Sequence, residues 1–120
     1  MFGGLCREVD ESGFDWLDVA DSQSVFRELT SRSRWPPSTP RPGPVGPLVT
    51  NPLTRHLVVI ASAIASVDQV SGGRAVLGIG SGDSAISTIG APPATVAGLE
   101  DSIVTLGRLT SGAPVEFLSR

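Results

Sequence analysis

The residues best suited to chemistry lie in a glycine-rich stretch in the second half of the chain, where residues 78–84 read GIGSGDS. Glycines let a backbone approach a ligand closely and point successive N–H groups at an anion, and the serines can donate hydroxyl hydrogen bonds. Asp83 could transfer a proton if it were buried. The spacing equally fits a tight glycine turn in which Asp83 caps the next segment. The candidate binding residues of this stretch are Gly80, Ser81, Gly82, Asp83 and Ser84.

Two further stretches lie at the carboxyl ends of predicted strands. Residues 21–23 read DSQ and residues 48–51 read LVTN. In parallel α/β folds a ligand binds beyond the carboxyl ends of the strands, so these stretches and the glycine-rich one are expected to converge there. They contribute Asp21, Leu48, Val49, Thr50 and Asn51 as candidate binding residues.

The only histidine and the only cysteine suggest little chemistry of their own. His56 follows Arg55 at the start of a predicted helix, where it could face a ligand or a phosphate, or simply form part of a solvated first turn. A single cysteine, Cys6, excludes an internal disulfide and any zinc site made of several cysteines. No metal site is predicted.

The elements that position these residues alternate between strands and helices. Alternation of this kind is typical of a parallel sheet with right-handed crossovers. Apolar residues at helical spacing predict a largely buried helix after Thr54, on the face of Val59, Ala63, Val67 and Val70, and Gly72 is placed to end it. In chain order we expect a strand at 14–20, a short helix from about 24, a strand ending at 48–50, a helix at 55–70, a strand at 74–80 and a helix at 95–109. In the last helix the apolar face comprises Val96, Leu99, Ile103, Leu106 and Leu109.

A proline-rich segment interrupts this order. Six of the ten prolines fall within residues 30–47. Each proline removes a backbone donor and pushes the preceding residue out of the helical region, so we expect this segment to be irregular.

Length and charge limit the classes of function. A chain of 120 residues is well short of the ~250 residues of a complete eight-stranded α/β barrel. The net charge of −3 argues against a nucleic-acid or anionic-membrane partner. No apolar run approaches the ~20 residues of a membrane span, and the N-terminus is unlike a signal peptide. We therefore expect a soluble, cytoplasmic protein.

Three blocks of the sequence resemble the luciferase-like monooxygenase superfamily. They are residues 13–29 (GFDWLDVADSQSVFREL), 46–56 (GPLVTNPLTRH) and 71–85 (SGGRAVLGIGSGDSA). Within it, they are most similar to the branch of methylenetetrahydromethanopterin reductase and other oxidoreductases that use the deazaflavin coenzyme F420. The blocks occur in the order and spacing of that branch, and the similarity as a whole extends over most of the chain.

The resemblance implies an α/β fold over residues 1–120, namely a partial (β/α)8 TIM barrel of about three parallel strand–helix units. It implies hydride transfer between coenzyme F420, or alternatively FMN, and a small organic substrate. Asp21 would face the cofactor ring, and Leu48 and Val49 would be joined by a non-proline cis peptide under it. Thr50 and Asn51 would line the same pocket. Residues 80–84 would approach the ring or the phosphate-bearing side chain, with Asp83 as a proton donor.

The sequence departs from this family in three ways. The family's first strand and everything after its fourth helix are expected to be absent. Leu57 stands where the family usually has proline, and the proline-rich segment stands where relatives carry an Ala/Leu-rich helix. Residues 30–41 can be encoded by bases that, read one base earlier than Ser31, give LSLALAALNTE. This favours two compensating insertions or deletions in the gene, the alternative being a genuine proline-rich insertion.

Two other functions remain open on the sequence. A partial barrel could be a truncated remnant without catalytic activity, and its open sheet edges could drive formation of a homo-oligomer. Residues 78–82 could instead belong to a nucleotide-binding module. That module needs an acidic residue ~20 residues further on, at the end of a strand, whereas Glu100 and Asp101 fall in a predicted helix.

Overall fold

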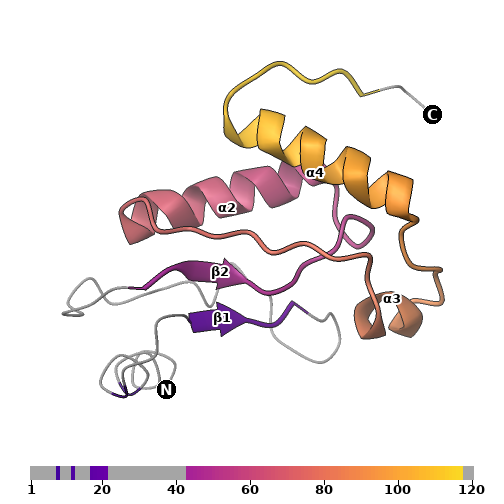
Figure 1. The fold of residues 1–120 in the computed structure, drawn as a ribbon, viewed down its shortest axis with the longest axis horizontal. Helices are drawn as coiled ribbons and strands as arrows, with labels where there is room; N and C mark the ends of the chain where they lie inside the picture. Colours follow the sequence, from indigo (N-terminus) through magenta and orange to yellow (C-terminus); the bar gives the residue numbers. More distant parts are fainter. Residues whose placement is uncertain (1–7, 9–11, 13–16, 22–42, 118–120) are drawn as a thin grey trace.

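The computed structural model of the chain describes residues 8, 12, 17–21 and 43–117. Within these residues α2 packs on β2, and α4 packs on α2 (Figure 1). The short α3 lies beside one end of the strands (Figure 1). The elements in chain order are β1 (Leu17–Val19), β2 (Val45–Pro47), α2 (Leu57–Ser71), α3 (Ser84–Thr88) and α4 (Val96–Thr110).

Three parallel segments form the sheet side of the molecule. β1 pairs with β2 in parallel, with Leu17 opposite Val45 and Val19 opposite Pro47. The predicted strand at 74–80 lies on the other side of β2, but it is joined by two isolated parallel bridges rather than by a continuous ladder. Pro47 accepts a hydrogen bond from the Gly78 N–H at 2.9 Å but has no N–H to give in return, which interrupts the ladder.

The second strand corrects the sequence prediction. It occupies Val45–Pro47, three residues earlier than the predicted strand end and inside the segment expected to be irregular. Val45 is buried against Ile64 and Val67 of α2, and β2 has a backbone partner on both sides. Tertiary pairing and burial therefore outweigh the local effect of the prolines. Residues 30–42 of the predicted irregular segment lie outside the described residues, as do residues 14–16 of the first predicted strand and the short helix predicted from residue 24.

The two long helices begin and end close to the predicted positions. α2 starts after His56, whose ring Nδ1 accepts a hydrogen bond from the Val58 N–H, so His56 is the cap in place of Thr54. Gly72 ends α2 in a left-handed conformation with φ 74°, as predicted. α4 starts after Thr95, whose hydroxyl oxygen accepts from the Gly98 N–H at 3.1 Å. The sequence analysis did not predict α3.

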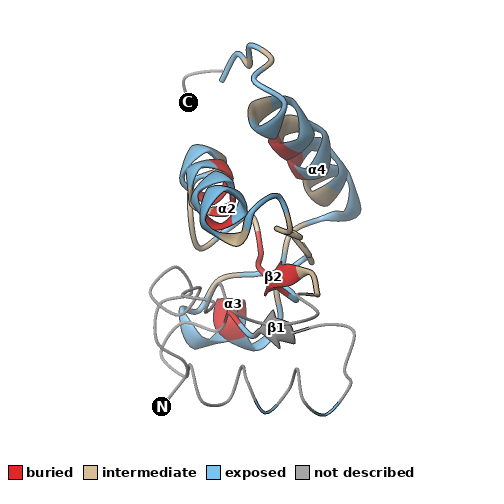
Figure 2. Ribbon diagram, turned by 90° about the vertical axis from the view of Figure 1, so that its left-hand side faces the viewer, coloured by how far each residue is buried: buried red, intermediate tan, exposed pale blue. Residues whose placement is uncertain are grey.

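The core is narrower than the sequence suggested. α2 buries Ile60, Ala61, Ile64 and Val67, whereas Val59 and Val70 are exposed (Figure 2). In α4 the buried apolar residue is Leu106, which joins a cluster with Ile60 and Ala61 of α2. α2 contacts β2 through Ile64 and Val67 and contacts α4 through Ile60 and Ala61, whereas α4, among the described helices and strands, packs along α2. On α4, Val96, Ile103 and Val104 are exposed.

No helix in the described part of the chain is long and apolar enough to cross a membrane.

Candidate functional site

Thr50 joins the three stretches that the sequence analysis expected to converge. Its hydroxyl donates to Oδ2 of Asp21 at 2.6 Å, just beyond β1. Its backbone N–H donates to the Gly78 carbonyl and its carbonyl accepts from the Gly80 N–H, both at 2.9 Å. Asp21 and Thr50 are both buried. The carboxyl ends of the parallel segments therefore meet at Thr50, which confirms the predicted juxtaposition of Asp21, Thr50 and Gly80.

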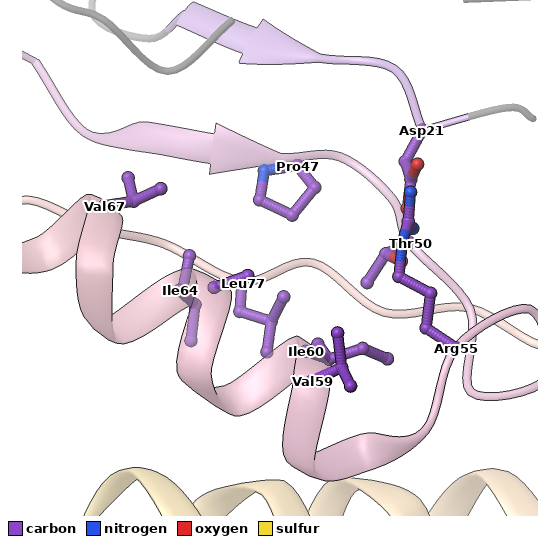
Figure 3. A pocket seen from close by; sticks show the side chains of 10 residues that line it. Asp21, Pro47, Thr50, Arg55, Val59, Ile60, Ile64, Val67 and Leu77 are labelled. Atoms are coloured by element: carbon purple, nitrogen blue, oxygen red, sulfur yellow. The ribbon is translucent and has the colours of Figure 1, made fainter. Parts of the chain in front are cut away.

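Arg55 adds a charge partner that the sequence analysis missed. Its Nη1 forms an ion pair and hydrogen bond with the same Oδ2 of Asp21 that Thr50 contacts (Figure 3). The Asp21 side chain is 4% exposed and that of Arg55 is 21% exposed. A buried carboxylate is costly unless it is paired and hydrogen-bonded, and Arg55 and Thr50 meet both conditions. The two charges are 34 residues apart, so no local pattern links them.

Asn51 braces the turn between the end of the strand segment and α2. Its side-chain Oδ1 accepts hydrogen bonds from the N–H groups of Leu53 and Thr54, at 3.1 and 2.9 Å. This is the local turn that asparagine favours. Asn51 is buried. Its side chain therefore shapes the loop from within, and its expected contact with a cofactor stays a prediction.

Leu48 and Val49 form a half-exposed apolar platform, here defined as these two side chains. The peptide bond between them is cis, as the family resemblance implied. Their residues are 44% and 49% exposed. A Cβ on Gly78 would lie 2.6 Å from Leu48 Cδ2, and a Cβ on Gly80 would lie 3.2 Å from Val49 Cγ2. Because Gly78 and Gly80 have no side chain, Leu48 and Val49 can pack against them. The two glycines therefore have a packing role in addition to any close approach to a ligand.

The remaining residues of the glycine-rich stretch lie at the surface. Ser81, Asp83 and Ser84 are exposed, and Gly82 has φ 91°, a conformation that favours glycine. Asp83 stands at the start of α3, where its carbonyl accepts from the Ile86 and Ser87 N–H groups, but its side chain makes no capping hydrogen bond. The burial that a proton-transfer role for Asp83 requires is not seen, and that role stays a prediction.

His56 lies at the start of α2. Besides capping the helix, its ring lies 5.0 Å from that of Phe117, measured between centroids. His56 is exposed, which favours the solvated first turn over contact with a phosphate.

An apolar cavity of about 110 Å³ lies between α2 and the strands. Asp21, Thr50 and Arg55 line one end of it, and side chains of α2 line the rest, among them Val59, Ile60 and Ile64 (Figure 3). The ion pair therefore borders the apolar core as well as the loop.

The family model described as luciferase-like monooxygenase matches residues 4–120. The chain belongs to this family. It is 35% identical over 81 residues to the 5,10-methylenetetrahydromethanopterin reductase of Methanopyrus kandleri, which covers 68% of this chain and 23% of that enzyme. It is 40% identical over 78 residues to the enzyme of the same name from Archaeoglobus fulgidus, covering 62% and 22%.

A solved luciferase-like structure extends the similarity to nearly the whole chain. The coenzyme F420 dependent tetrahydromethanopterin reductase from Methanopyrus kandleri matches with a TM-score of 0.75 and 28% identity. The match covers 98% of this chain and 38% of that one. The chain is thus an α/β luciferase-like fold that spans less than a quarter of the length of the curated relatives it matches.

Proposed function

We propose that this chain forms one side of a coenzyme F420 site in an oxidoreductase that transfers hydride between F420 and a small organic substrate. The observation that carries the proposal is Thr50, which holds the Leu48–Val49 platform and the glycine-rich stretch together at the carboxyl ends of three parallel segments. The similarity to an F420 dependent reductase supports the same cofactor.

The residues at this end fit a planar cofactor with an anionic side chain. Leu48 and Val49 present an exposed apolar surface on which a flat ring system can lie. Gly80 and Gly82 make room for Val49 and Ile86, which a Cβ would meet at 3.2 and 2.3 Å, and thereby keep the backbone of this stretch next to the platform. Ser81 is exposed, and its hydroxyl can donate to an anionic group. When bound, F420 accepts or supplies the hydride at its ring.

The contribution of these residues to the reaction is to bind and orient. Hydride transfer requires the reacting atoms to be held about 3–3.5 Å apart in aligned geometry. Thr50 and Asn51 are buried and make hydrogen bonds within the site, so they can keep the platform in one place. We infer that the remainder of the pocket, including the part that selects the substrate, comes from strand–helix units beyond these 120 residues. The isolated chain is accordingly expected to bind F420 weakly.

Titration with F420, followed by the fluorescence of the cofactor, tests the proposal. Val49→Asp places a charge on the platform and should abolish binding. Val70→Asp makes the same change on a residue of α2 that is 73% exposed, away from the platform, and should leave binding unchanged. Both variants need matching circular dichroism spectra.

Three results would count against the proposal. They are no binding of F420 by the parent chain, equal losses in the two variants, or tighter binding of FMN than of F420. The first would favour a remnant that does not bind the cofactor, and the last would assign the site to FMN.

A further inference from the structure

The starting point is a single carboxylate oxygen with two donors. Oδ2 of Asp21 accepts from the Thr50 hydroxyl and from Nη1 of Arg55. These donors come from positions 29 and 34 residues further along the chain. Because the Asp21 side chain is almost fully buried, the ion pair with the guanidinium of Arg55 offsets part of the cost of burying its charge.

The chain of contacts runs from Arg55 to the glycine-rich stretch. Arg55 holds Asp21, Asp21 holds the side chain of Thr50, and the backbone of Thr50 bonds to Gly78 and Gly80. Val49, next to Thr50, sits over Gly80. A shift of the Asp21 carboxylate would therefore move both the Leu48–Val49 platform and the glycine-rich stretch of the proposed cofactor site.

We infer that Arg55 is a positioning residue of this site. It acts through Asp21 and Thr50 and fixes the platform against the glycine-rich stretch. That this ordering serves a cofactor site rests on the proposed function. The ordering itself rests on the contacts of Arg55 with Asp21 and of Asp21 with Thr50.

A purely local role for Arg55 fits the structure less well. Arg55 lies before α2, in a turn that the Asn51 side chain already braces through two backbone N–H groups. The cap of α2 is His56. What Arg55 adds is the link from this turn to the end of β1.

Amide hydrogen exchange of the full chain tests the inference without any cofactor. Arg55→Met keeps an unbranched apolar stem and removes the charge and the donors. Asp21→Asn combined with Arg55→Met removes both charges and keeps a side-chain oxygen that can accept from Thr50. Arg74→Met is the matched control. The Arg74 guanidinium donates to the Gly43 and Ser71 carbonyls at the start of the segment 74–80, whereas Gly80 lies at its end.

We expect Arg55→Met to speed exchange of the Thr50 and Gly80 amides about tenfold or more, with the Leu106 amide of α4 unchanged. The double variant should recover most of that protection, and Arg74→Met should leave both amides as they were. Equal acceleration at Leu106, or a double variant no better protected than Arg55→Met, would overturn the inference.

Two further measurements keep the test decisive. If Arg55→Met does not fold, Arg55→Gln replaces it, since a glutamine removes the charge opposite the buried Asp21 carboxylate but keeps an unbranched polar side chain. Selective acceleration at Thr50 and Gly80 is then expected, and unchanged exchange at both overturns the inference. F420 titration of the parent chain is separate: absence of binding there, with the exchange pattern intact, rejects the proposed function and leaves the positioning role of Arg55 standing.

Discussion

Replacing Thr50 by valine removes one hydroxyl from the centre of the site and little else. Valine has the same branched shape and the same preference for extended backbone, so the N–H and carbonyl bonds to Gly78 and Gly80 can persist. The change deletes the donor that contacts Oδ2 of Asp21 at 2.6 Å. Asp21 then keeps Arg55 but loses a second partner in a buried position.

The magnitude follows from the burial of the acceptor. A hydrogen bond to a charged group contributes about 1.5–3 kcal/mol to stability, and the Asp21 side chain is only 4% exposed, so water cannot readily replace the hydroxyl. With a urea m-value of roughly 1–3 kcal/mol/M for a small protein, the midpoint should fall by about 1 M.

Urea unfolding followed by far-ultraviolet circular dichroism measures this shift. Thr88→Val is the matched control, because Thr88 is exposed and its hydroxyl donates to the Ser84 carbonyl at the surface of α3. Such a surface substitution usually changes stability by no more than about 0.5 kcal/mol. If Thr50→Val moved the midpoint no further than Thr88→Val, the Asp21–Thr50 bond would not hold the strand ends together, and the reasoning would be wrong.

Four more outcomes are expected. Gly78→Ala should destabilise the chain by about 1–3 kcal/mol in the same urea assay, because the new Cβ would meet Leu48; Gly107→Ala, in open space on α4, should be neutral or stabilising. The isolated chain should show no F420 turnover with a generic hydride donor, and measurable turnover would mean that these 120 residues suffice for a working site. Light scattering coupled to size-exclusion chromatography should find self-association through exposed apolar side chains such as Val104, and a strictly monomeric chain would contradict this. Resequencing the gene across codons 30–41 should reveal compensating insertions or deletions; an unambiguous in-frame reading of SRSRWPPSTP would refute the shifted frame.

Local signals in the sequence were enough to predict the two long helices and the end of the strands at which Asp21, Thr50 and Gly80 meet. Gly72 ends α2 and Thr95 begins α4 through hydrogen bonds to residues only a few positions away, so the nearby sequence is enough to predict these helix ends. The convergence of Asp21, Thr50 and Gly80 follows from a general rule of parallel sheets. The cis peptide between Leu48 and Val49 was implied by family resemblance and not by any local pattern.

Tertiary structure decided the remaining features. β2 lies at Val45–Pro47 because neighbouring segments pair with it on both sides, a fact absent from its own proline-rich sequence. Val59 and Val70 are exposed because α2 packs through the stripe that contains Ile64, although helical spacing alone made both sides look apolar. Arg55 meets Asp21 only because the fold brings together two positions that are 34 residues apart in the sequence. Helix ends depend on short-range hydrogen bonds, whereas buried charge pairs and strand positions depend on which distant segments share a core.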